Sequence, residues 1–405
     1  MSTVPLPVIF VIFQTGRRAN GGVESITQVV EQVQRIKPIV VTQIETSMHR
    51  RWHDAGAEVH VWPLSGRMGN SVRGSNFSRK LRHIWSIAYA NYWMWQLVRA
   101  TGCRVVHCND ILSLWHTAIG ARSAGALVVQ SIRGVKEAHE HYGWHWKLAL
   151  WLSHRQLVNS QEMRAALIER ITGHQLPEQG KRTAIASIYS MIDLCYMRPV
   201  GLAERERLRH GLGIGTEQFA IGFVATFSAL KAQRAFIEAA GPLLRGAVPA
   251  CQVYFLGDFT PEDNDYARAC VEAVQRLGLE SIIRFVGFTA NVVDWYRALD
   301  VVVVASRREG LARCMIESLA CGTPVVSFDV CSAREILVQY DCGRVVPQGD
   351  YAGLVRELET LASNISLRNA LGAKGRQTAR ELFHPVLITE QYEHLYSDLV
   401  RATHD

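Results

Sequence analysis

A run of four consecutive valines, Val301–Val304, limits what this chain can fold into more than any other stretch. Continuous β-branched residues without polar alternation favour a parallel strand that is covered on both faces. A second apolar run begins at Val325, directly after the helix stop Gly-Thr-Pro at 322–324. The residues between the two runs suffice for a loop and a helix, so residues 300–337 predict a strand–loop–helix–strand unit of an α/β fold.

Two glutamates occupy fixed places in this unit, Glu309 at the end of the loop and Glu317 eight residues later. A helix that begins near Ala312 would turn its unpaired N–H groups and positive dipole end towards Gly310 and Leu311, which favours binding of an anion such as a phosphate. At ~1.5 Å per residue the two carboxylates lie on the order of 10–12 Å apart. That spacing fits a nucleotide sugar whose hexose, diphosphate and ribose follow one another along the unit. The alternative is an ordinary βαβ unit with solvated glutamates.

Length and composition predict a globular protein of two domains, because 405 residues exceed one core of common size. The apolar run 8–13 is short, lacks a basic start and precedes a glycine-rich loop, so it predicts a first strand rather than a signal peptide. No apolar stretch reaches the ~18 residues of a membrane span. Nine cysteines without CxxC pairs indicate reduced thiols and no zinc site. We expect a protein of the cytoplasm or of the cytoplasmic face of a membrane.

The basic charge lies in the first half of the chain. Residues 1–200 hold 23 Lys and Arg against 12 Asp and Glu, or +11, whereas residues 201–405 hold 21 against 25, or −4. Nine of the ten tryptophans precede residue 152. Basic and aromatic residues together predict contact with lipid headgroups or with a phosphate-bearing acceptor, and no nucleic-acid motif is present. The basic, aromatic segment 67–99 predicts either a helix packed on the sheet or a segment that leans on an anionic membrane.

Glycines follow the first strand, and Gly21 and Gly22 precede a helix that we expect from Val23. The pattern is not GxGxxG, so it does not predict a nicotinamide site. A glycine pair at a helix start lets a phosphate approach the backbone closely, while the alternative is a tight turn.

Further polar residues follow predicted strands, and ligands collect at the carboxyl ends of strands in open α/β sheets. After the strand around Val106 come His107, Asn109 and Asp110, which we assign to the acceptor side, although a histidine there is more often a packed residue. Arg133 follows the next strand, which begins at Leu127. The histidines between 139 and 145 suggest a loop on the acceptor side rather than a metal site.

In the second half, the strand 220–224 leads into a loop that contains Thr226 and Lys231. An ammonium group beside a helix start is well placed to neutralise charge growing on a departing diphosphate. The alternative is an exposed loop lysine. Two further strands end in loops at Gly257 and Gly287.

The unit 300–337 also resembles the C-terminal signature of the family 4 glycosyltransferases, which are retaining enzymes of the GT-B fold. The resemblance rests on Ser306-x-x-Glu309-Gly310, Glu317, Ala320-x-Gly322-x-Pro324-Val325-Val326 and Arg334-Glu335. It implies two facing Rossmann-like domains with parallel sheets, at 1–195 and 196–383, and a helix at 384–405 that crosses back to the first domain.

The resemblance further implies transfer of a hexose, with retained configuration, from a nucleotide diphosphate sugar to a hydroxyl acceptor. We expect a lipid-linked or surface-polysaccharide precursor as acceptor, no cofactor and no metal. Lys231, Glu309 and Arg133 would act in catalysis. The donor would bind at Gly21, Gly22, Thr226, Gly257, Gly287, Phe288, Gly310, Leu311, Ala312 and Glu317.

The chain departs from the family at two site positions. Arg133 stands where many members have a histidine that touches the sugar, and Thr226 stands where an arginine is usual. An arginine holds oxygens but does not exchange protons near neutral pH. Two alternatives therefore stay open, a GT-B sugar-binding or partner subunit without catalysis and a GT-B-like epimerase. The cations that could compensate for the lost arginine are Arg234, Arg307, Arg308 and Arg313.

Overall fold

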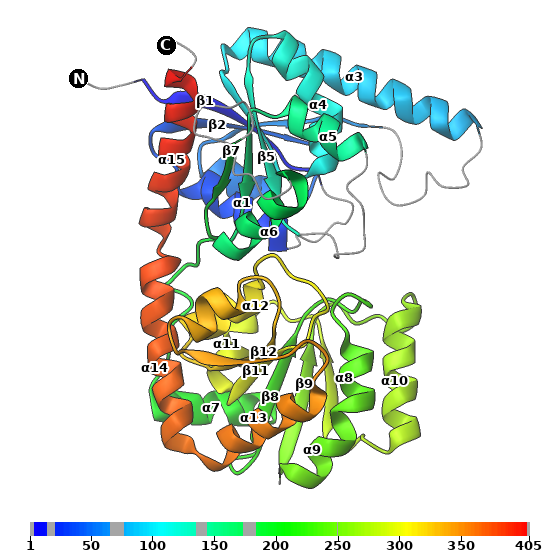
Figure 1. Cartoon of the computed structure of the whole chain (residues 1–405), viewed down its shortest axis with the longest axis vertical. Helices are drawn as coiled ribbons and strands as arrows, with labels where there is room; N and C mark the ends of the chain where they lie inside the picture. The colour runs from blue at the N-terminus through cyan, green and yellow to red at the C-terminus, as the bar shows by residue number, and fades with distance from the viewer. Residues whose placement is uncertain are drawn as a thin grey trace. The chain divides into compact units, whose positions relative to one another are not determined.

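The computed structural model describes residues 4–13, 21–64, 77–134, 144–172, 184–248 and 250–402, and it describes the backbone alone at 77–82, 144–145, 170–172 and 184. The chain divides into two compact units (Figure 1). The first comprises Met1–Met191 and Pro385–Asp405, and the second comprises Ile192–His384. The chain thus leaves the first unit and returns to it with its last helix.

The first unit is built on a parallel sheet, which has seven strands among the described residues, in the order β3-β2-β1-β4-β5-β6-β7. Its centre is apolar, since Val8, Ile9, Phe10 and Val11 are fully buried. The strands are β1 (Leu6–Val11), β2 (Ile36–Thr42), β3 (Glu58–Val61), β4 (Val105–Cys108), β5 (Leu127–Ile132), β6 (Arg155–Val158) and β7 (Ala184–Ser187).

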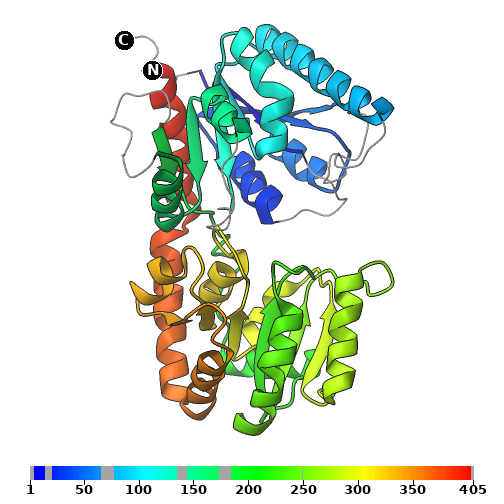
Figure 2. The same cartoon turned by 45° about the vertical axis from the view of Figure 1, so that its right-hand side comes forward.

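Helices cover both faces of this sheet. They are α1 (Gly21–Gln32), α2 (Met48–Asp54), α3 (Phe77–Thr101), α4 (Ile111–Ser123), α5 (Trp144–Leu152), α6 (Gln161–Thr172) and α15 (Pro385–Arg401). Because successive strand residues point to opposite faces, Val8 and Phe10 pack with α1, α2 and α15, whereas Ile9 and Val11 pack with α3, α4 and α5. Figure 2 shows α3, blue to cyan, along the outside of the unit. No helix among the described residues is long and apolar enough to cross a membrane.

The C-terminal helix packs on the first unit, as the sequence predicts. Helix α14 ends at Leu382 and Pro385 begins α15, because proline lacks the N–H that a helix interior needs but fits the first turn. The buried side chains of Tyr392 and Tyr396 join the core around β1. The carboxylate of Glu393 accepts from the backbone N–H groups of Gln34 and Arg35, each at 2.7 Å.

The second unit has a parallel sheet of six strands among its described residues, in the order β10-β9-β8-β11-β12-β13. Its strands are β8 (Phe219–Val224), β9 (Cys251–Leu256), β10 (Ile283–Gly287), β11 (Val301–Val304), β12 (Val325–Phe328) and β13 (Gly343–Val346). The valine run is β11 and is buried along its whole length, which confirms the predicted α/β class.

Helices and one π-helical turn connect these strands. They are α7 (Leu202–Leu212), α8 (Gln233–Ala239), α9 (Gly241–Ala247), α10 (Asp265–Leu277), α11 (Val292–Ala298), α12 (Arg313–Ala320), η1 (Arg334–Val338), α13 (Tyr351–Ser363) and α14 (Ile365–Leu382). Helix α12 begins one residue after Ala312, close to the predicted position. Helix α1 begins at Gly21 rather than at Val23, so the glycine pair belongs to its first turn.

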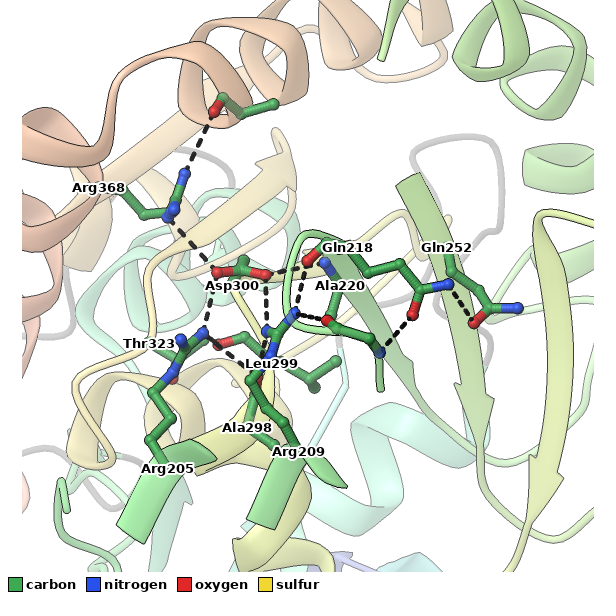
Figure 3. Close-up of polar contacts among 12 residues, drawn as sticks. Arg205, Arg209, Gln218, Ala220, Gln252, Ala298, Leu299, Asp300, Thr323 and Arg368 are labelled. Carbon is green, nitrogen blue, oxygen red and sulfur yellow. Dashed lines mark hydrogen bonds and ion pairs between the residues drawn. The ribbon is translucent and has the colours of Figure 1, made fainter. Parts of the chain in front are cut away.

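A buried carboxylate holds the second unit together at the N-terminal end of β11 (Figure 3). Asp300 accepts from Arg205 at 2.9 Å, from Arg209 at 3.0 Å and from the N–H of Ala220 at 2.9 Å, and it lies 3.6 Å from the guanidinium of Arg368. Arg209 is only 5 % exposed. One side chain thereby joins α7, β8, β11 and α14.

We predict that Asp300→Asn lowers the free energy of unfolding of the second unit by about 3 kcal/mol, because it leaves a buried guanidinium without its counter-charge. Urea denaturation followed by circular dichroism measures this loss. The matched control is Asp341→Asn, which removes an exposed partner of Lys374 and should leave the unfolding midpoint unchanged. Equal midpoints for both variants would contradict the role of Asp300.

Candidate functional site

A carboxylate and an ammonium group meet at the carboxyl ends of two neighbouring strands of the second unit. Glu309 follows β11 and Lys231 follows β8, and these strands pair directly. The Oε1 atom of Glu309 accepts from Lys231 Nζ at 2.5 Å and from the buried Ser306 hydroxyl at 2.7 Å. Both bonds use the same oxygen, so the geometry fixes the carboxylate and directs its Oε2 atom elsewhere.

The second predicted carboxylate, Glu317, is held on both oxygens. Arg313, one turn earlier on α12, donates to Oε1 at 3.0 Å, and the Tyr296 hydroxyl donates to Oε2 at 2.9 Å. Burial and the charge of Glu317 raise the pKa of Tyr296 well above its ordinary value, so this phenol keeps its proton. The structure therefore gives Glu317 one fixed orientation.

The start of α12 lies between these carboxylates in the chain. Ala312 is the N-cap residue and supplies no side-chain hydrogen bond to the first turn. Gly310, Leu311 and Ala312 are buried, so this helix start is more enclosed than the sequence alone suggests. Binding of a phosphate to its N–H groups stays a prediction.

The backbone conformation alone explains why two of the predicted donor-binding positions are glycines. Gly257 has φ +150°, and a Cβ there would lie 1.9 Å from the carbonyl oxygen of Ala225. Gly287 has φ +82°, in the left-handed region. Thr226 offers its carbonyl to Gln233 at 2.9 Å, and Phe288 is 56 % exposed. The glycines shape the loops around this site whatever binds there.

The thiol of Cys314, on α12, lies near the carboxylates of Glu309 and Glu317. Burial, together with the charge of Glu309, raises its pKa to about 12. The thiol is therefore protonated at neutral pH, and a protonated thiol is a poor nucleophile.

A second polar cluster lies in the first unit, at the ends of β4 and β5. The ring of His107 is fully buried, and its Nδ1 and Nε2 atoms lie 2.6 Å from the Tyr396 hydroxyl and 2.7 Å from the Ser131 hydroxyl. Burial, with a smaller effect of the Arg133 charge, lowers the pKa of His107 to about 3. This imidazole is therefore neutral at physiological pH.

The other predicted acceptor-side residues surround Arg133. Its guanidinium donates to Asn109 Oδ1 at 2.6 and 3.2 Å. Asp110 caps α4, where its side chain accepts from the N–H of Ser113 at 2.7 Å, and burial raises the pKa of this carboxyl. The structure thus brings Arg133 and Asn109 together, and it gives Asp110 a structural role as a helix cap.

Gly21 and Gly22 form the first turn of α1, and the carbonyl of Gly21 accepts from the Ser25 hydroxyl at 2.7 Å. The proposed loop at His139 and His141 lies outside the described residues, as does the side chain of His145. Within the described part of the chain no cluster of three or more His, Cys, Asp or Glu could hold a metal.

Two supporting residues, Tyr296 and Tyr396, are absent from the sequence-based assignment. Tyr296 lies 21 residues before Glu317, and Tyr396 lies 289 residues after His107. Neither spacing carries a local signal, because tertiary packing alone brings these hydroxyls to their partners.

Comparisons with known proteins agree with this architecture. Residues 218–364 match the family model Glycosyl transferases group 1. The structure of the Anabaena protein HepE in complex with UDP and glucose superposes with a TM-score of 0.78 over 96 % of this chain and 99 % of that one, at 19 % identity. The fold is GT-B. At this identity the superposition speaks for the GT-B fold alone.

Two curated relatives of this chain are also described as glycosyltransferases. The putative glycosyltransferase EpsD of Bacillus subtilis is 28 % identical over 305 residues, which cover 72 % of this chain and 76 % of the relative. The capsular polysaccharide biosynthesis glycosyltransferase CapM of Staphylococcus aureus is 28 % identical over 114 residues, 28 % of this chain and 30 % of that one. Together with the family model, they support a glycosyltransferase of the GT-B fold.

We predict that His107 makes the first unit less stable in acid. The unfolded chain takes up a proton near pH 6.5, whereas the folded ring does so only near pH 3, so its contribution is present above pH 6.5 and is lost as the pH falls through this window. The loss is about 1.4 kcal/mol per pH unit.

The free energy of unfolding, measured by denaturant titration between pH 7 and pH 4, tests this. In His107→Gln the free energy of unfolding should fall less steeply with decreasing pH, by the equivalent of one proton. The raised pKa of Asp110 acts in the opposite sense, but it does so equally in both proteins. Identical slopes would contradict the assignment.

Proposed function

We propose that this chain transfers a hexose from a nucleotide diphosphate sugar to a hydroxyl acceptor, with retention of the anomeric configuration. The observation that carries the proposal is the pair formed by Glu309 and Lys231 at the ends of two adjacent strands. The match of residues 218–364 to the group 1 glycosyltransferases supports it.

The contacts of the second unit suggest how each part of the donor binds. The ammonium of Lys231 has three N–H donors, of which Glu309 takes one, so two remain for the diphosphate. The Oε2 atom of Glu309 would accept a hexose hydroxyl. Glu317, oriented by Arg313 and Tyr296, would accept the ribose hydroxyls.

The chemistry we propose is stabilisation of the leaving group. The bond from the anomeric carbon to the diphosphate breaks, while Lys231 and the dipole of α12 stabilise the growing charge. The acceptor oxygen bonds to the same face of the sugar, and the departing phosphate takes its proton. The protonated Cys314 thiol would not act as a nucleophile in this step. Because the cations belong to the protein, we expect a chelator to leave the rate unchanged.

For the acceptor we propose a lipid-linked or surface-polysaccharide precursor at the cytoplasmic face of a membrane. The capsular polysaccharide relative supports this choice. Arg133, fixed by Asn109, would hold an anionic or hydroxyl oxygen of the acceptor but would not exchange a proton.

We predict that Lys231→Ala lowers kcat by about 10²–10³-fold, because the leaving diphosphate loses its counter-charge. Glu309→Gln, which keeps the volume of the side chain, should also lower turnover. Release of nucleotide from UDP-sugars, measured by chromatography with and without an acceptor extract, gives the rates. The control Lys374→Ala removes an exposed lysine of the same unit and should leave kcat unchanged.

Wild-type protein that binds a nucleotide sugar without any turnover would contradict transfer and favour a sugar-binding subunit. Formation of an epimerised nucleotide sugar would instead favour the epimerase. A thermal-shift comparison of UDP-, GDP- and ADP-sugars selects the donor for both measurements.

We further predict that Tyr296→Phe raises the KM for the donor about tenfold, because Glu317 loses a hydrogen bond that orients its carboxylate. The kcat should change little, since Glu317 is proposed to bind the ribose and not the reacting carbon. Tyr254→Phe is the matched control, since its hydroxyl bonds to Gln252 instead. A fall in kcat at constant KM would show that Tyr296 serves the chemical step.

A further inference from the structure

The outer face of α3 carries side chains that a water-facing helix seldom has. Among its described side chains, the exposed large hydrophobic ones are mostly aromatic, and Trp85 is 69 % and Ile84 61 % exposed. At 100° per residue these positions share one side of the helix, where a surface helix normally places charged and polar residues. We call this side the aromatic face. It comprises Ile84, Trp85, Tyr89, Tyr92 and Trp95.

The opposite side of α3 is fixed to the first unit. The side chain of Asn91 accepts from the N–H of Gly120 at 2.8 Å and donates to the carbonyl of Trp115 at 3.3 Å. A Cβ at Gly120 would lie 1.9 Å from the carbonyl oxygen of Asn91, so the backbones of α3 and α4 touch. Met94 and Val98 are buried on the same side. The aromatic face is therefore the outside of a firmly packed helix.

The stretch of sequence that contains α3 carries charge of one sign. Residues 59–109 contain no Asp or Glu and hold seven Arg and Lys. The guanidinium carbon of Arg99, on the same helix, lies 5.5 Å from the centre of the Trp95 ring. Tryptophan and tyrosine beside cations match the region between the headgroups and the acyl chains of an anionic bilayer. A symmetric contact with a second copy would instead bring two such basic segments together.

We propose that the aromatic face of α3 docks on an anionic phospholipid bilayer. The proposal names a partner surface for the function proposed above, in which the acceptor is lipid-linked, but it is measured without any transfer reaction. The Trp and Tyr rings enter the interface, and the Arg and Lys residues of this stretch of sequence attract the anionic headgroups.

Cosedimentation with vesicles tests the proposal on the full chain. Wild-type protein should partition to phosphatidylcholine vesicles that contain 30 mol % phosphatidylglycerol, about tenfold more than to phosphatidylcholine alone. The preference should weaken in 0.5 M NaCl, because salt screens exposed charges. Equal binding to both vesicles, or binding to neither, would overturn the proposal.

Variants locate the contact. The double variant Trp85→Ser with Tyr89→Ser should lose about tenfold in partitioning while keeping the circular dichroism spectrum and Tm of the wild type, since both side chains are exposed. Tyr196→Ser is the control, because it removes a half-exposed tyrosine of the second unit. Wild-type partitioning by the double variant would overturn the proposal, as would a wild-type dimer in light scattering that the double variant abolishes. Nucleotide release by the same variants is scored separately, so failure of transfer is distinguishable from failure of docking.

Discussion

The pair of Glu309 and Lys231 is the interaction on which the candidate donor site depends. It forms because β8 and β11 are neighbours in a parallel sheet. The loops that follow these two strands are far apart in sequence but begin at the same end of the sheet. Arg313 and Glu317 repeat the arrangement on α12. Each carboxylate is thus accompanied by its own cation. A diphosphate that enters would share the ammonium with Glu309 rather than meet an isolated positive charge.

The position of this pair, at the carboxyl ends of the strands, depends on contacts at the N-terminal end of β11. Asp300 precedes β11 and accepts hydrogen bonds from two arginines and from the backbone of β8. These bonds set the position of β11, and the loop after this strand contains Ser306 and Glu309. In the first unit an uncharged side chain links the elements in the same way. His107, on β4, forms hydrogen bonds with a hydroxyl of β5 and a hydroxyl of α15. Buried polar groups with all partners in place give each sheet one arrangement.

The sequence alone predicts the features that local patterns encode. The valine run identifies β11, the Gly-Thr-Pro stop separates α12 from β12, and Pro385 marks the start of α15. It does not predict the partners that tertiary packing selects, such as Tyr296 for Glu317 or Arg209 for Asp300. The sequence also does not predict strand β7, because its four residues carry little periodic signal. The aromatic residues of α3 are ambiguous in the sequence for a related reason, because tertiary packing, such as that of Asn91 on Gly120, distinguishes the buried side of the helix from the outer side.

A crystal structure of the chain with a nucleotide diphosphate sugar tests the central claim most directly. The account predicts diphosphate oxygens within hydrogen-bond distance of Lys231 Nζ and of the first N–H groups of α12, a hexose hydroxyl on Glu309, and ribose hydroxyls on Glu317. A donor bound elsewhere, with the Lys231–Glu309 and Arg313–Glu317 pairs unchanged and untouched, would contradict it.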